Sequence, residues 1–125
     1  MIQISNDMIV YPGQYFTTGG GSDTNNLALT SSALVVTVAT TNDKLTGMIP
    51  DYEEDGAICY VINSGAGGAK NLVIPHNSAS STVGFRFDLT PFTTLTLGPQ
   101  QTQLFFYSPE GAVPGWKPYI AGTFT

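Results

Sequence analysis

The chain has 125 residues, of which 42% are hydrophobic and only 10% charged, with a formal net charge of -5 from nine acidic and four basic residues. This length suits one domain with a sizeable core, and the scattered basic residues argue against binding to nucleic acid or to an anionic membrane surface. No continuous apolar run is long enough to span a bilayer, and MIQISNDMIVYPGQ (residues 1–14) lacks the regions of a signal peptide.

Residues 1–26 are expected to form an N-terminal arm and linker. MIVYPGQYFTT (residues 8–18) is apolar and aromatic but is interrupted by Pro12-Gly13. TTGGGSDTNN (residues 17–26) has the composition of a flexible polar linker. An apolar segment on such a linker suits an arm that docks on another surface. The alternative interpretation, an edge strand followed by a long loop, stays open.

Residues 27–125 are expected to form a β-sandwich domain. Short alternating segments between Gly/Pro turns predict strands over residues 33–41, 57–63, 71–74, 85–89, 94–97, 102–107 and 116–120. AICYVIN (57–63) is apolar on both faces, which predicts a central strand covered on both sides. No segment carries a helical stripe, and PDYEEDG (50–56) predicts at most one helical turn. The predicted fold is an all-β, antiparallel β-sandwich of jelly-roll type.

Two single residues are candidates for chemistry. His76 lies at the edge of a polar loop with Ser78, Ser80 and Ser81 nearby, but no strained elbow such as GxSxG supports a catalytic triad. A loop histidine that hydrogen-bonds locally is the favoured interpretation. Cys59 is the only cysteine and lies in the most apolar strand, so we expect a buried, inert thiol and no internal disulfide.

The acidic run DYEED (51–55) lacks the spacing of a calcium loop, so a solvated turn is favoured over a weak cation site. No metal, cofactor or catalytic residue is therefore assigned. Exposed aromatic residues offer another possible site, because they can stack on sugar rings. The candidates are Tyr11, Tyr15, Phe16, Tyr107, Trp116 and Tyr119.

The order of punctuating motifs over residues 50–120 is distinctive. It comprises the Asp55-Gly56 turn, AICYVIN, NLVIPHNSASST, FRF and TLTLGPQQTQLFFYSPEGAVPGW. This order resembles a β-sandwich module common in structural proteins of tailed bacteriophages, in head decoration and tail-fibre components. In such modules a GxxQ-like turn precedes a strand with a terminal aromatic residue, and a Trp follows. The chain has Gly115 where the pattern has a basic residue before the Trp.

The resemblance implies a non-enzymatic, oligomeric virion protein, most similar to a capsid decoration (cement) protein on the phage head. Its partners would be the major capsid protein and sister subunits, with a homotrimer favoured. The arm would then lie against one of these partners, and deleting residues 2–18 is expected to leave a folded protein that no longer binds its shell. The expected arm contacts are Ile4, Met8, Ile9, Tyr11, Tyr15 and Phe16.

Two other functions stay open. A receptor- or carbohydrate-binding head of a tail fibre or spike would share the fold, and glycan binding would distinguish it. A small β-sandwich enzyme would need convergent titratable groups, and the chain offers nine carboxylates and one histidine.

Overall fold

The computed structural model describes residues 13–51 and 56–119. Over these ranges the chain forms eleven β-strands and no helix, so the predicted all-β class is confirmed. The strands are β1 (Gln14–Thr17), β2 (Leu27–Ala28), β3 (Ala33–Thr37), β4 (Asp43–Lys44), β5 (Met48–Ile49), β6 (Ile58–Asn63), β7 (Leu72–Pro75), β8 (Arg86–Phe87), β9 (Thr94–Leu97), β10 (Thr102–Ser108) and β11 (Gly115–Pro118).

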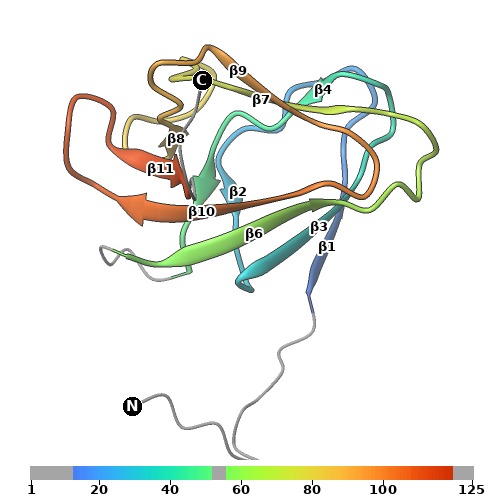
Figure 1. The fold of residues 1–125 in the computed structure, drawn as a ribbon, viewed down its shortest axis with the longest axis horizontal. Helices are drawn as coiled ribbons and strands as arrows, with labels where there is room; N and C mark the ends of the chain where they lie inside the picture. Colours follow the sequence, from blue (N-terminus) through green and yellow to red (C-terminus); the bar gives the residue numbers. More distant parts are fainter. Residues whose placement is uncertain (1–12, 52–55, 120–125) are drawn as a thin grey trace, which may run out of the picture.

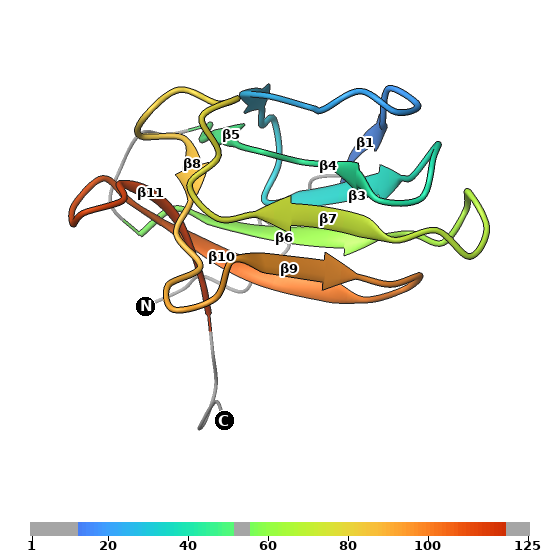
Figure 2. The same cartoon turned by 90° about the horizontal axis from the view of Figure 1, so that it is seen from above.

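The largest sheet has six strands in the order β1-β3-β6-β10-β11-β8. A three-stranded sheet, β4-β7-β9, lies over one face of it, and the pair β2-β5 completes the same side (Figures 1 and 2). The other face of the six-stranded sheet carries no strand of the described chain (Figure 1). The two faces of this sheet therefore meet different surroundings.

The predicted antiparallel arrangement is wrong, because the sheets are mixed. Five of the eight strand pairings in the described ranges are parallel: β1 with β3, β3 with β6, β2 with β5, β4 with β7, and β8 with β11. Between β3 and β6 the chain leaves the large sheet to form β4 and β5, and such a crossover lets the next strand run parallel. Alternation of apolar residues reports which face is buried and does not report strand direction.

The seven predicted strands correspond to β3 and β6 to β11. Inward and outward positions of FRFDL are also confirmed, because Phe87 and Leu89 are buried while Arg86 and Asp88 are half-buried. The prediction that AICYVIN is covered on both sides is wrong. Cys59 and Val61 face the core, but Ile58 and Tyr60 on the other face are exposed.

The core lies between the two sheets. Its fully buried side chains come from both layers, for example Leu34 and Phe105 from the large sheet and Ile74 from the smaller one. Trp116 is also fully buried, and its Nε1 donates a 2.8 Å hydrogen bond to the Met48 carbonyl oxygen. This bond ties β11 to β5, so Trp116 is a core residue and not an interface residue.

Candidate interaction surface

The uncovered face of the six-stranded sheet, called the outer face below, is lined by apolar side chains. They alternate with the buried residues of β1, β3, β6 and β10, and the register adds one residue just after β11, opposite Leu104. The apolar members of the outer face are Tyr15, Ala33, Val35, Ile58, Tyr60, Ile62, Leu104, Phe106 and Tyr119, and by register Thr17, Thr37, Thr102 and Lys117 share the same face.

Strand register brings these side chains into adjacent rows. Tyr15 pairs with Val35, which in turn pairs with Ile62. In the next row, Ala33 pairs with Tyr60, and Tyr60 pairs with Leu104. Directly paired residues on one face lie about 5 Å apart, so the rows form one continuous patch and not scattered apolar residues.

Four members of the outer face are large and exposed: Tyr15 is 79% exposed, Tyr119 58%, Ile58 48% and Tyr60 43%. One cation lies on the outer face by register, because Lys117 of β11 pairs with Phe106. Its Nζ is held by carbonyl oxygens of the loop before β11, with the shortest bond, 3.0 Å, to Val113. A continuous apolar patch of this kind marks an interaction site more often than a bare surface.

The predicted arm contacts divide between the two faces of β1. Tyr15 lies on the outer face, whereas Phe16 is half-buried and packs against the core. Ile4, Met8, Ile9 and Tyr11 lie outside the described residues, so their contacts stay predictions. For Gln14–Thr17 the edge-strand interpretation holds, because β1 pairs with β3 at the end of the sheet.

Sequence reasoning missed the β6 and β10 members of the outer face. The available signal was the apolar character of both faces of AICYVIN and of LFF within β10. For AICYVIN this pattern predicts burial under a second layer, although a surface that binds another protein gives the same pattern. The pattern in β10 led to no surface prediction. Ile58, Tyr60, Leu104 and Phe106 are the residues concerned.

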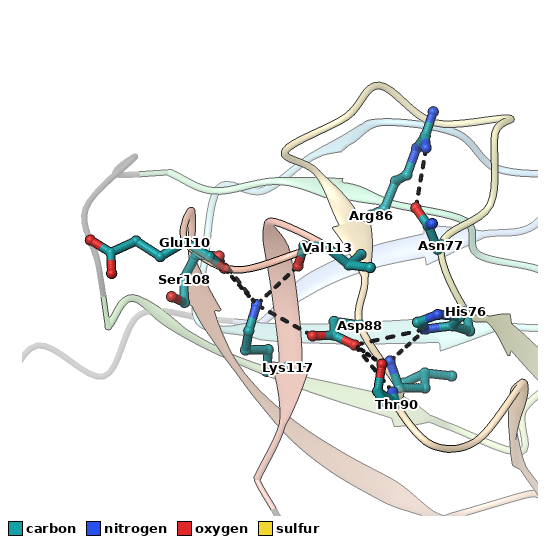
Figure 3. Close-up of polar contacts among 10 residues, drawn as sticks. His76, Asn77, Arg86, Asp88, Thr90, Ser108, Glu110, Val113 and Lys117 are labelled. Atoms are coloured by element: carbon teal, nitrogen blue, oxygen red, sulfur yellow. Dashed lines mark hydrogen bonds and ion pairs between the residues drawn. The ribbon is translucent and has the colours of Figure 1, made fainter.

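His76 belongs to a polar cluster with Asp88, Thr90 and Lys117 at the β11-β8 end of the six-stranded sheet (Figure 3). Its Nδ1 accepts a 2.9 Å hydrogen bond from the Leu89 amide and lies 3.9 Å from the Asp88 carboxylate. Asp88 also accepts a 2.6 Å bond from the Thr90 hydroxyl and lies 3.7 Å from Lys117 Nζ. The histidine thus links β7 to the segment after β8, which confirms the prediction of local hydrogen bonding.

The electrostatics of this cluster follow from the same contacts. Partial burial raises the pKa of Asp88, but the hydrogen bonds from Thr90 and the positive charge of Lys117 outweigh burial, so the pKa lies below its ordinary value. Asp88 is therefore an anion at neutral pH. Asp88 therefore connects Lys117 of β11 to Thr90 in the segment after β8, which is a structural role.

One serine of the loop after His76 makes contacts away from the histidine. Ser81 is buried, and its Oγ accepts a 3.1 Å bond from the Asn26 amide and lies 2.7 Å from Thr46 Oγ1. Arg86 Nε donates a 2.7 Å bond to the Ser81 carbonyl oxygen. Ser81 therefore attaches the loop after His76 to Asn26, to Thr46 and to Arg86 of β8.

The remaining candidates give no site in the described ranges. Burial raises the pKa of Cys59 to about 12, so its thiol is unreactive at neutral pH, as predicted. Residues 13–51 and 56–119 contain no group of three His, Cys, Asp or Glu side chains that could hold a metal ion. Residues 52–55 of the acidic run lie outside these ranges, and the described Asp51 is exposed.

The aromatic candidates for sugar stacking are divided by burial. Trp116 and Tyr107 are core residues whose rings lie 5.3 Å apart, so neither offers a face to a ligand. Tyr15 and Tyr119 are exposed on the outer face. Among these predicted candidates, the exposed ones in the described ranges therefore lie on the outer face.

Comparisons with protein-family models, with curated proteins and with solved structures found no match to this chain. Within the described part of the chain, no helix is long and apolar enough to cross a membrane.

Proposed function

We propose that this chain is a virion structural protein, a capsid decoration (cement) protein that binds the outside of a phage head and stabilises contacts between capsomers. The single observation that carries the proposal is the outer face, a continuous apolar surface whose centre carries no charge. An apolar surface of this kind suits a protein interface, because burying apolar groups is favourable while burying charges is costly.

The resemblance over residues 50–120 supplies the viral part of the proposal. The modules that the chain resembles are non-enzymatic β-sandwiches of jelly-roll type, and the layering of two sheets supports the same class. The protein would act at the phage head surface with the major capsid protein and sister subunits as its partners, preferably as a homotrimer. Whatever binds only the assembled shell favours the assembled state by mass action.

The test is co-sedimentation with undecorated heads assembled from the major capsid protein of the same phage. The full chain should sediment with the heads and saturate at a fixed ratio to the capsomers. Leu104→Asp, which places a charge on the outer face, should reduce binding at least tenfold, because the charge loses water without gaining a partner. Val83→Asp is the matched control, since Val83 is 62% exposed and lies in the loop before β8. Absence of saturable binding by the full chain would refute the proposal.

A second function is favoured by the exposed tyrosines of the outer face. Tyr15, Tyr60 and Tyr119 offer aromatic surfaces on which sugar rings could stack, as a receptor- or carbohydrate-binding head would require. A glycan array probed with the full chain distinguishes this function. Binding that is lost in Tyr60→Ala, with no retention on undecorated heads, would favour the tail-fibre or spike head over the cement protein.

A further inference from the structure

We infer that the outer face is a self-association surface, covered by residues 1–12 of a second copy of this chain. The inference rests on the proposed function in taking the protein to be an interface-built oligomer, and it names the partner of the outer face. Three observations carry it: the composition of residues 1–12, the position of Gly13 at the edge of the outer face, and the area of the face.

Residues 1–12 have the composition of a segment that covers an apolar surface. MIQISNDMIVYP contains one charged residue, Asp7, and its apolar positions include Ile2, Ile4, Met8 and Ile9. The outer face is also uncharged in its centre. A chain with a net charge of -5 repels its own copies elsewhere on its surface, so a contact between copies is least unfavourable where neither side carries charge.

Strand register shows where Gly13, the residue that follows this segment, lies on the sheet. Gln14 pairs with Leu34, which places Gly13 beside Ala33; a Cβ atom built on Gly13 would lie 3.1 Å from a Val35 methyl group and 3.9 Å from the Ala33 Cβ. The first described residue, Gly13, therefore lies at the edge of the sheet and on the side of the outer face, and residues 1–12 are joined to the protein at that point.

The area of the outer face favours exchange of these segments over simple stacking of two faces. Five strands about 4.8 Å apart and about five residues long give a face of roughly 400 Å². Two such faces in contact would bury only about 400 Å² per copy, half of the roughly 800 Å² of a stable interface. An extended segment of residues 1–12, about 40 Å long and about 10 Å across, matches the face in area.

If every copy gives its segment to one neighbour and receives one from another, each copy buries both its face and its segment, roughly 800 Å². This contact is heterologous, and it closes into a ring when the rotation between copies allows. The association is therefore expected to produce a closed oligomer of defined number.

The first experiment measures the mass of the full-length protein by light scattering over a concentration series. The chain has a mass of 13.2 kDa, so a stable integer multiple of that mass is expected. Tyr60→Asp should raise the dissociation constant about tenfold or more, because the charge would be desolvated in the middle of the interface. Val83→Asp introduces the same charge at an exposed site off the face and should leave the mass unchanged. A monomeric full chain, or an oligomer unaffected by Tyr60→Asp, would overturn the inference.

The second experiment locates the covering segment by disulfide trapping between differently tagged chains. A chain carrying Ile4→Cys is mixed with a chain carrying Tyr60→Cys under mild oxidation, while the native Cys59 is buried. A mixed disulfide is expected, and the pair Ile4→Cys with Val83→Cys is the control that should form none. An oligomer without the mixed disulfide, or a single chain carrying both cysteines that closes only on itself, would overturn the exchange.

These outcomes are independent of the capsid test. An oligomer with the mixed disulfide that never binds heads would support the inference and refute the cement function. A monomer that binds heads through Leu104 would do the reverse, because the outer face would then meet the capsid protein.

Discussion

At the scale of single residues, buried polar side chains replace missing backbone pairing where strands end. Asp43, at the start of β4, is only 4% exposed, and its carboxylate accepts hydrogen bonds from the Thr18 hydroxyl and from the amides of Gly21 and Thr40. Burial raises the pKa of Asp43, but these hydrogen bonds outweigh it, so the pKa lies below its ordinary value. The carboxylate thus joins the segment after β1 to the turn before β4.

Asp43→Asn should lower the free energy of unfolding by about 1–3 kcal/mol at neutral pH, because an amide replaces one acceptor with a donor that faces other donors. The lowered pKa fixes the sign of the pH dependence. The unfolded state binds the proton more readily, so the stabilisation by Asp43 is complete above the ordinary pKa and is lost as pH falls through the lower folded-state value. Urea unfolding at pH 7 and pH 3 measures both effects.

The variant and the native chain should therefore differ less at pH 3 than at pH 7. Asp23→Asn is a suitable control, because Asp23 is exposed and lies in the same polar segment. An equal loss at both pH values would show that Asp43 contributes shape and not charge.

At the scale of elements, the approach of β8 to β11 depends on a glycine. Gly115 pairs with Arg86, has a φ of 143°, and a Cβ atom there would lie 2.1 Å from the Arg86 carbonyl oxygen. This contact explains in physical terms why glycine, and not the basic residue of the phage pattern, precedes Trp116. A side chain at this position would separate the two strands.

Gly115→Ala should therefore lower the free energy of unfolding by about 2 kcal/mol or more, from the strained φ and the forced movement of β8 together. Gly111→Ala is the matched control, because Gly111 also has a positive φ, of 95°, but has open space at its Cβ position. Gly111→Ala should lower the free energy of unfolding by only about 1 kcal/mol. Equal losses of stability in the two variants, measured by thermal or urea unfolding, would show that the close approach of β8 to β11 does not make Gly115 necessary.

The longer elements could be predicted from sequence, and their arrangement could not. Alternation of apolar residues identified β3 and β6 to β11. One face of each strand is buried, and burial of one face gives an apolar residue at every second position. The two-residue strands β2, β4 and β5 are too short to show any period. Parallel pairing follows from the path of the chain through the second layer, which no local pattern records.

The candidate surface was predictable only in part for a related reason. Tyr15 was identified because it lies in an aromatic segment next to a linker. Tyr60 was assigned to a doubly covered strand, and Leu104 was placed in a strand without any surface role. A strand whose outer side chains bind another protein has the same apolar composition as a strand that is buried within its own domain. The two kinds of strand differ in whether a second layer covers them. Only the sheet topology shows that, within the described residues, no strand covers this face.

At the scale of the whole molecule, the folded body begins earlier than the expected division at residue 26. Phe16 in β1 packs against the core, Thr18 binds Asp43, and the Thr24 amide donates a 2.8 Å bond to the Lys44 carbonyl oxygen. Residues 14–26 thus contribute contacts to the sheets, and the freely removable part is expected to be residues 1–12.

Two truncations test this boundary. Deleting residues 2–12 should change the free energy of unfolding by less than about 1 kcal/mol, whereas deleting residues 2–18 should cost about 3 kcal/mol or more, because Phe16 leaves the core. Both are measured by urea unfolding in the Leu104→Asp background, so that loss of an oligomer does not contribute to the difference. The deletion of residues 2–18 is therefore not a suitable test of shell binding, because it also destabilises the fold. The deletion of residues 2–12 removes the arm and leaves the fold intact. Equal stability of the two truncated chains would show that β1 is dispensable and return the boundary to residue 18 or beyond.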